Sequence, residues 1–298
     1  MTQRQTLQAA LIQQRCTSNP ADNLARATAA VEQAATDGAR LVVLQELFNT
    51  TYFCQTENPA CFELAEPVPG PATTALGRLA ARLGVVIVAP LFERRAPGLY
   101  HNSAAVLDSD GRLAGIYRKM HIPDDPGYYE KFYFTPGDGI WRPIRTRVGH
   151  LGVLICWDQW FPEAARLMTL AGADILLYPT AIGWDPGEAP AERTRQQEAW
   201  LTVQRAHAIA NSLPLLCCNR TGFEPVPGGN VESGIEFWGS SFACGPQGEM
   251  LAQAPAGDEA VLMVTLDLGR TEEVRRSWPF LRDRRIDSYG ELTARWRD

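Results

Sequence analysis

Short apolar runs alternate along the chain with longer segments in which apolar residues recur every three or four positions. Residues 7–12, 41–45 and 85–91 are apolar runs of strand length. Residues 20–35 and 73–83 lie between these runs and have the spacing of amphipathic helices. The order strand, helix, strand, helix, strand predicts an α/β protein whose strands are buried on both faces.

A related order of elements follows in the second half. The Asp110-Gly111 turn predicts a hairpin between strands at 102–107 and 112–119, and residues 239–251 have a similar turn placement. Further elements are predicted as strands over 151–156, 174–178 and 214–218 and as helices over 162–172 and 191–212. Two related halves, each with a mixed sheet, predict a four-layer α-β-β-α sandwich with the helices outside.

The two halves are predicted to form one domain over residues 1–298. No stretch rich in proline, glycine and serine separates them. Residues 277–298 are rich in Trp, Phe and Arg, which indicates either a C-terminal arm that contacts a partner or a surface tail. The arm interpretation predicts a homo-oligomer.

Composition and charge exclude several classes of protein. With 45% hydrophobic and 21% charged residues, the chain has the composition of a globular protein. A net charge of −6 argues against a nucleic-acid partner. A charge of this size is also common simply because it favours solubility. Residues 1–10 lack the apolar core of a secretory signal, and no apolar run is long enough for a membrane span, so we expect a cytoplasmic protein without a membrane partner.

The seven cysteines are scattered and contain no C-x-x-C pair. We therefore expect free thiols and no structural zinc site. Cys156 stands out because it ends an apolar strand directly before a predicted helix. The positive end of a helix dipole would lower the pKa of this thiol, and nearby backbone N–H groups would hold an oxyanion. The alternative is a thiol that only fills space in the core.

Two further charged residues occupy comparable positions at strand ends. Glu46 ends the buried run 41–45, and Lys119 ends the predicted hairpin. Taken alone, each residue has an ordinary structural alternative. Glu46 could cap the following helix, and Lys119 could be an exposed surface charge. Together with Cys156 they supply a nucleophile, a base and a cation, which is the set that acyl transfer needs.

The segments around these three residues resemble a known family. Residues 44–48 (LQELF), 117–123 (YRKMHIP) and 154–163 (LICWDQWFPE) are similar, in this order, to the motifs of the nitrilase superfamily of carbon–nitrogen hydrolases. The resemblance extends over almost the entire chain and implies the α-β-β-α sandwich. It also implies that Glu46 is the general base, Lys119 the stabiliser of the tetrahedral intermediate and Cys156 the nucleophile.

Two more residues take roles from the same resemblance. Glu130 matches a second family glutamate, which positions groups or handles protons, and Trp157 supplies a backbone amide next to the nucleophile. The alternative for Glu130 is a surface ion pair with Lys131 or Arg118. The resemblance implies no organic cofactor and no metal.

Other segments indicate the kind of substrate. Residues 49–54, 121–134, 178–183 and 218–222 most resemble a branch of the family whose substrate is an N-carbamoyl amine that ends in an ammonium group. Such a substrate needs acceptors at the far end of its pocket. The candidates are Asp185, Glu188, Asp124 and Asp125, for each of which a solvated loop charge is the alternative. Tyr52 and Trp184 are candidates to line the alkyl path, or are core packing.

Three other functions remain open at this point. Relatives with the same chemistry, such as β-ureidopropionase, N-carbamoyl amino acid hydrolases and ω-amidases, bind a substrate carboxylate, for which Arg193, Arg195 and Arg220 are candidates. A non-catalytic binding member of the fold is a second alternative. A nucleotide-binding α/β protein is a third, although no strand is followed by a glycine-rich phosphate motif.

Overall fold

The computed structural model describes residues 6–229 and 232–297. Within these residues, two six-stranded mixed sheets and one three-stranded sheet are formed. The first sheet has the strand order β15-β1-β2-β3-β4-β5, the second the order β14-β13-β10-β8-β7-β6, and the third the order β11-β12-β9. The two large sheets correspond to the two predicted halves, except that β15 from the end of the chain completes the first sheet.

The bounds of the strands are as follows. The first sheet contains β1 (Thr6–Gln13), β2 (Leu41–Leu44), β3 (Val86–Ala96), β4 (Leu99–Leu107), β5 (Leu113–Arg118) and β15 (Ala260–Asp267). The second contains β6 (Ile144–Thr146), β7 (Gly149–Val153), β8 (Ile175–Thr180), β10 (Leu215–Asn219), β13 (Phe242–Cys244) and β14 (Met250–Gln253). The third contains β9 (Gly183–Trp184), β11 (Thr221–Pro225) and β12 (Gly234–Trp238).

The helices connect these strands. The α-helices are α1 (Pro20–Thr36), α2 (Pro71–Leu83), α3 (Glu130–Tyr133), α4 (Pro162–Leu170), α5 (Pro190–Asn211) and α6 (Leu268–Ser277). The 3-10 helices are η1 (Phe53–Gln55), η2 (Pro59–Leu64), η3 (Cys156–Trp160) and η4 (Gly290–Thr293). No helix among the described residues is both long and apolar enough to cross a membrane.

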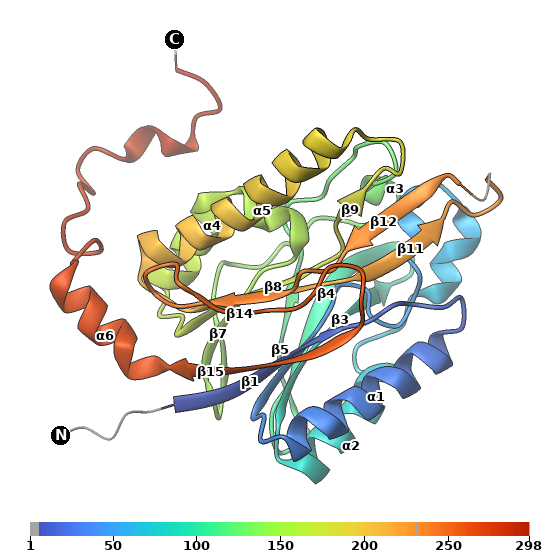
Figure 1. Ribbon diagram of the computed structural model, residues 1–298, viewed down its shortest axis with the longest axis horizontal. Helices are drawn as coiled ribbons and strands as arrows, with labels where there is room; N and C mark the ends of the chain where they lie inside the picture. The colour runs from blue at the N-terminus through green and yellow to red at the C-terminus, as the bar shows by residue number, and fades with distance from the viewer. Residues whose placement is uncertain (1–5, 230–231, 298) are drawn as a thin grey trace.

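The layers follow from the alternation of side chains along the strands. On β1, Ala10 and Ile12 pack into a cluster with α1 and α2, whereas Ala9 and Leu11 pack on the other face against the second sheet. The outer face of the second sheet is covered by α4 and α5, for example by Trp200 of α5. Figure 1 shows these two helix pairs on opposite sides of the sheets. The predicted α/β sandwich of two mixed sheets with helices outside is confirmed.

The edge at which strands end positions the candidate site. Strands β1, β2 and β3 run parallel, and β5 has the direction of β3 because each is antiparallel to β4. The carboxyl ends of β2 and β5 therefore lie at the same edge of the first sheet, and Glu46 and Lys119 follow these ends. Cys156 follows β7, which runs parallel to β8 in the facing sheet.

Two details differ from the sequence prediction. The predicted strand 151–156 ends at Val153, and Cys156 instead begins the 3-10 helix η3. The three-stranded sheet was not predicted, because β9 and β12 are short and pair only through contacts between distant parts of the chain. Gly183 of β9 and Trp238 of β12 line the cavity that also reaches Cys156.

Candidate active site

A buried network of charges joins the ends of β2, β4 and β5. Nζ of Lys119 donates hydrogen bonds to Oε1 of Glu46 at 2.8 Å and to Oε2 of Glu130 at 2.6 Å. Nδ2 of Asn102 donates to the same Glu46 oxygen at 2.7 Å. All four residues are fully buried, so the alternatives of an exposed charge for Lys119 and of a surface ion pair for Glu130 are both wrong.

The two oxygens of Glu46 have different surroundings. Oε1 accepts from both Lys119 and Asn102, whereas Oε2 is buried and has no hydrogen-bond partner among the described residues. Lys119 uses two of its three N–H donors on Glu46 and Glu130. One carboxylate oxygen of Glu46 and one ammonium proton of Lys119 thus have no hydrogen-bond partner among the described residues. Of this network, Glu130 lines the cavity that reaches Cys156, whereas Glu46 and Lys119 are not in its described lining.

Burial shifts the pKa values of this network. Burial alone would lower the pKa of Lys119, but the carboxylates of Glu130 and Glu46 outweigh it and hold this pKa well above its usual value. Burial raises the pKa of Glu130 to about 7, against the opposing effect of Lys119. The network therefore keeps the lysine charged and makes Glu130 a carboxyl group that titrates near neutral pH.

Cys156 lies in a strained turn between the two sheets. Its φ of +41° is a left-handed conformation that non-glycine residues rarely adopt, and its Sγ lies 4.0 Å from the carbonyl oxygen of Ala181. The prediction of a lowered thiol pKa is wrong: burial, with the Glu46 carboxylate in addition, raises the pKa of Cys156 well above its usual value. The resting thiol is protonated, so attack requires a base beside it.

The turn that carries Glu46 is held by a second buried ion pair. Leu47 has φ +50°, and Arg220 donates to the backbone carbonyl oxygens of Glu46, Leu47 and Thr50 at 3.0, 2.8 and 2.9 Å. The same guanidinium pairs with Glu224 at 2.6 Å. Arg220 is fully buried and does not line the cavity, so its predicted alternative role as a ligand of a substrate carboxylate is wrong.

A cavity of about 450 Å³ leads from Cys156 and Glu130 toward the loop before α5. Its walls are largely apolar and aromatic, which suits an alkyl chain. The apolar and aromatic lining residues are Pro123, Pro126, Tyr128, Trp157, Trp160, Ala181, Ile182, Ala199 and Trp238. The ionisable lining beyond Glu130, Tyr128 and Cys156 consists of Asp125, Asp185 and Glu188, and the described lining contains neither arginine nor lysine.

Four of the seven residues predicted to contact substrate line this cavity, namely Trp157, Asp185, Glu188 and Asp125. Two of the other three, Asp124 and Tyr52, are corrected as follows. Asp124 is exposed and lies outside the lining. Tyr52 is buried beneath the site, where its hydroxyl donates to Oε1 of Glu130 at 2.7 Å.

The three acidic residues of the cavity differ in their exposure. Asp125 and Asp185 are exposed, whereas Glu188 is half-buried. Oε1 of Glu188 accepts a hydrogen bond from Nε2 of Gln196 at 2.7 Å, and Oε2 is buried without a partner among the described residues. A desolvated carboxylate oxygen of this kind is stabilised by a cation.

The remaining arginine candidates have other partners. Arg193 lies over the ring of Trp184 at 5.6 Å and pairs with Glu236 at 3.2 Å. Arg195 is exposed and pairs with Glu192 on the surface of α5. Neither arginine lines the cavity, and Trp184 does not line it either. The alkyl-path interpretation of Trp184 is therefore wrong, and its alternative, packing against the core, agrees with its contact with Trp238. Trp160 and Trp238 line the cavity in its place.

Several residues of the site were not predicted from the sequence. Trp160 lies within the quoted motif 154–163, so its proximity to Cys156 was a usable signal. Asn102, Gln196 and Trp238 come from separate elements that only the folded chain brings to the site. No local pattern marks them.

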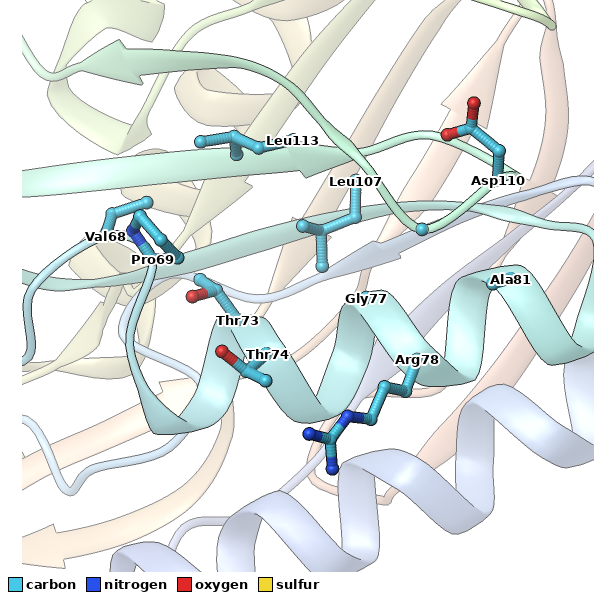
Figure 2. Close-up of a pocket in the computed structure, with 11 residues that line it drawn as sticks. Val68, Pro69, Thr73, Thr74, Gly77, Arg78, Ala81, Leu107, Asp110 and Leu113 are labelled. Atoms are coloured by element: carbon cyan, nitrogen blue, oxygen red, sulfur yellow. The ribbon is translucent and has the colours of Figure 1, made fainter.

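A second hollow lies under α2 (Figure 2). It has a volume of about 330 Å³ and is lined by one side of this helix together with residues at the turn between β4 and β5. Its charged lining consists of Arg78 and Asp110, and neither cysteine nor histidine is among its described lining residues. The groups suited to covalent chemistry are therefore those of the Cys156 cavity.

The fold brings a buried thiol, two glutamates and a lysine close together, and these are groups that acyl transfer uses. The chain belongs to the carbon–nitrogen hydrolase family, since residues 8–276 match the description "Carbon-nitrogen hydrolase". It is thus an enzyme of the class that hydrolyses carbon–nitrogen bonds other than peptide bonds.

Individual relatives are similar over nearly their whole length. The chain is 44% identical over 284 residues to the N-carbamoylputrescine amidase of Solanum lycopersicum, with 95% of this chain and 93% of the relative covered. It is 38% identical to the citrullinase of Francisella tularensis, with 97% and 99% covered. The crystal structure of a carbon–nitrogen hydrolase from Helicobacter pylori G27 is 52% identical and superposes with a TM-score of 0.95, covering 98% of this chain and all of the other.

Proposed function

We propose that this enzyme hydrolyses the ureido group of N-carbamoylputrescine to putrescine, carbon dioxide and ammonia, a step of polyamine synthesis from agmatine. The observation that carries the proposal is the partnerless, buried Oε2 of Glu188 in a cavity whose far end is lined by carboxylates. The similarity to an N-carbamoylputrescine amidase over 95% of the chain supports it.

The first half-reaction forms a thiocarbamoyl enzyme. Oε2 of Glu46 takes the thiol proton while Sγ of Cys156 attacks the ureido carbon. The carbonyl oxygen becomes an oxyanion, which the remaining N–H of Lys119 and the backbone N–H of Trp157 stabilise. Glu46 then protonates one ureido nitrogen, the bond from carbon to that nitrogen breaks, and an amine leaves.

The second half-reaction releases the carbamoyl group with one molecule of water. Glu46 takes a proton from the water as its oxygen attacks the thiocarbamoyl carbon. Collapse of the intermediate breaks the carbon–sulfur bond, and Glu46 returns the proton to the sulfur of Cys156. The released carbamic acid decomposes to carbon dioxide and the second amine, so that one water yields putrescine, carbon dioxide and ammonia.

Recognition at the far end separates this substrate from others with the same ureido group. An ammonium placed on Glu188 gains a charge-assisted hydrogen bond, whereas a substrate carboxylate at this point faces Asp125, Asp185 and Glu188 without an arginine or lysine in the described lining. A buried charge left without a partner costs several kcal/mol, or about 10³-fold in specificity. The acidic lining therefore favours N-carbamoylputrescine over N-carbamoyl-β-alanine and over citrulline.

The test is ammonia release from a panel that contains N-carbamoylputrescine, N-carbamoyl-β-alanine, citrulline and an ω-amide. We expect the highest kcat/KM with N-carbamoylputrescine. A higher value with N-carbamoyl-β-alanine would refute the proposed substrate and retain the hydrolase class. Preference for citrulline would instead move the function to that of the Francisella tularensis relative.

We also infer that the protein is a single domain whose C-terminal arm, residues 277–298, packs against a second copy. Several large apolar side chains of this segment are exposed in the single chain: Trp278, Phe280, Ile286, Tyr289, Leu292 and Trp296. Apolar surface of this kind is typical of an interface. Sedimentation should give a dimer or larger species for the full chain, and a monomer at all concentrations would contradict the inference.

A further inference from the structure

Asp158 is a fully buried carboxylate two residues after Cys156, and it does not line the active-site cavity. Its Oδ1 accepts a hydrogen bond from the backbone N–H of His121 at 3.1 Å and is paired with Nδ1 of the same ring at 2.7 Å. Its Oδ2 accepts from the hydroxyl of Tyr117 at 2.7 Å and from the backbone N–H of Ile155 at 2.9 Å. One side chain thus takes part in four hydrogen bonds.

These bonds connect the two halves of the active site. Tyr117 lies on β5 of the first sheet, two residues before Lys119, and His121 lies two residues after Lys119 on the segment that leaves this strand. Ile155 directly precedes Cys156, on the turn that follows β7 of the second sheet. Asp158 therefore joins both flanks of the lysine to the turn of the nucleophile.

The partners of Asp158 are themselves held in place. The ring of His121 stacks on Phe161, with centroids 3.8 Å apart and planes inclined by 5°. Tyr117 is buried, and burial together with the Asp158 carboxylate raises its pKa well above the usual value, so its hydroxyl remains a donor. A buried network with fixed partners of this kind specifies one geometry.

We propose that Asp158 is a positioning residue, which fixes the strained Cys156 turn relative to Lys119. This inference rests on the catalytic roles proposed above for those two residues. Cys156 holds φ +41°, which persists only where the surroundings impose it. A displacement of about 1 Å in a reacting group can lower the rate about 10²-fold. Because Asp158 has no contact with the cavity, its loss lowers kcat and leaves KM unchanged.

A matched pair of tyrosines tests this proposal with minimal disturbance of the fold. Tyr117 and Tyr178 are both buried, but the Tyr178 hydroxyl has no hydrogen-bond partner within the described part of the chain. Tyr117→Phe should lower kcat about 10-fold at unchanged KM, while Tyr178→Phe should change neither constant. Asp158→Asn, which disturbs all four hydrogen bonds, should lower kcat about 100-fold.

The concentration of active sites in each preparation is taken as the amount of Cys156 that iodoacetamide alkylates, and kcat is calculated per active site. The Tm of each variant is measured as well. A lower Tm of Tyr117→Phe with unchanged kcat per site would show a purely structural role and overturn the proposal. Equal losses in the two tyrosine variants would overturn it as well. If the wild type releases no ammonia from N-carbamoylputrescine, the proposed function fails, and the three variants are compared on the panel substrate that the enzyme does hydrolyse.

Discussion

The two ends of the active-site cavity are built in different ways. At the ureido end, Glu130 lines the cavity, and behind it Glu46 and Lys119 are fully buried, with the Lys119 ammonium bonded to both carboxylates. At the far end, Asp185 is exposed and Glu188 is half-buried, with one oxygen that has no partner among the described residues. The charges at the ureido end thus have partners within the chain, whereas the far end keeps one carboxylate oxygen that the ammonium of the proposed substrate would pair.

This difference separates chemistry from selectivity. Every substrate of the class presents the same carbonyl to the ureido end, so changes there should affect all substrates alike. Changes at the far end should affect substrates according to the charge that they carry. The predictions below begin at the ureido end, where the largest effects are expected.

The largest effect is expected for Cys156→Ser. A serine hydroxyl is far less acidic than a thiol and cannot replace it as a nucleophile for Glu46, so turnover should fall by at least about 10⁴-fold with every substrate. Cys217→Ser is the matched control, since Cys217 is also fully buried but does not line the cavity. Near-normal activity of Cys156→Ser, or an equal loss in the control, would contradict the nucleophile assignment.

A smaller loss, about 10³-fold in kcat, is expected for Lys119→Met. The substitution removes the cation beside the developing oxyanion and leaves Glu46 and Glu130 without their shared partner. Lys131→Met changes an exposed lysine next to Glu130 and should leave kcat unchanged. The test is the steady-state kcat of the two variants. A comparable loss of kcat in both would refute the role of Lys119.

Glu130 should make stability depend on pH. Its pKa is raised from 4.5 to about 7 in the folded protein, so the folded state holds this proton more tightly than the unfolded state does. Its stabilising contribution is therefore present below pH 4.5 and is lost as the pH rises to about 7, by about 3 kcal/mol in total. Urea unfolding of wild type and Glu130→Gln at pH 4.5 and 7.5 should show this loss in the wild type only. A parallel pH dependence in both proteins would contradict the raised pKa.

The smallest effect is expected for Asp125→Asn at the far end. Asp125 lines the cavity but is exposed, so water screens its charge and its pairing with an ammonium contributes about 0–1 kcal/mol. We expect kcat/KM for N-carbamoylputrescine to fall by no more than about 5-fold, and Asp124→Asn, outside the cavity, to have no effect. A loss of about 10²-fold for Asp125→Asn would move the cation site from Glu188 to this residue.

The sequence alone predicted the ureido end because its residues stand at the ends of strands. Apolar runs identify β2 and β7, and Glu46 and Cys156 follow these strands. Because the two strands lie in different sheets, it was the complementary chemistry of the residues and the resemblance to the family motifs that placed them in one predicted site. The expected roles of these residues came from the resemblance to the family motifs. Glu130, within the motif 121–134, was found in the same way.

The hydrogen-bond partners that hold these residues in place could not be predicted from the sequence. Asn102 and Arg220 contact Glu46 or its backbone from 56 and 174 positions away in the chain, and only the folded arrangement shows which side chain faces which. The pKa of Cys156 was predicted in the wrong direction for a related reason. The sequence showed the helix that follows, but not the burial and the nearby Glu46 carboxylate that outweigh it.

The most direct test of the account is the ratio of kcat/KM for N-carbamoylputrescine to that for N-carbamoyl-β-alanine, measured in the wild type and in Glu188→Gln. The two substrates are identical at the ureido end and opposite in charge at the other end. We predict a ratio of about 10³ or more in the wild type and a fall of at least about 10-fold in the variant. A wild-type ratio near or below one, or a ratio that Glu188→Gln leaves unchanged, would contradict the assignment of Glu188 as the site that selects the substrate.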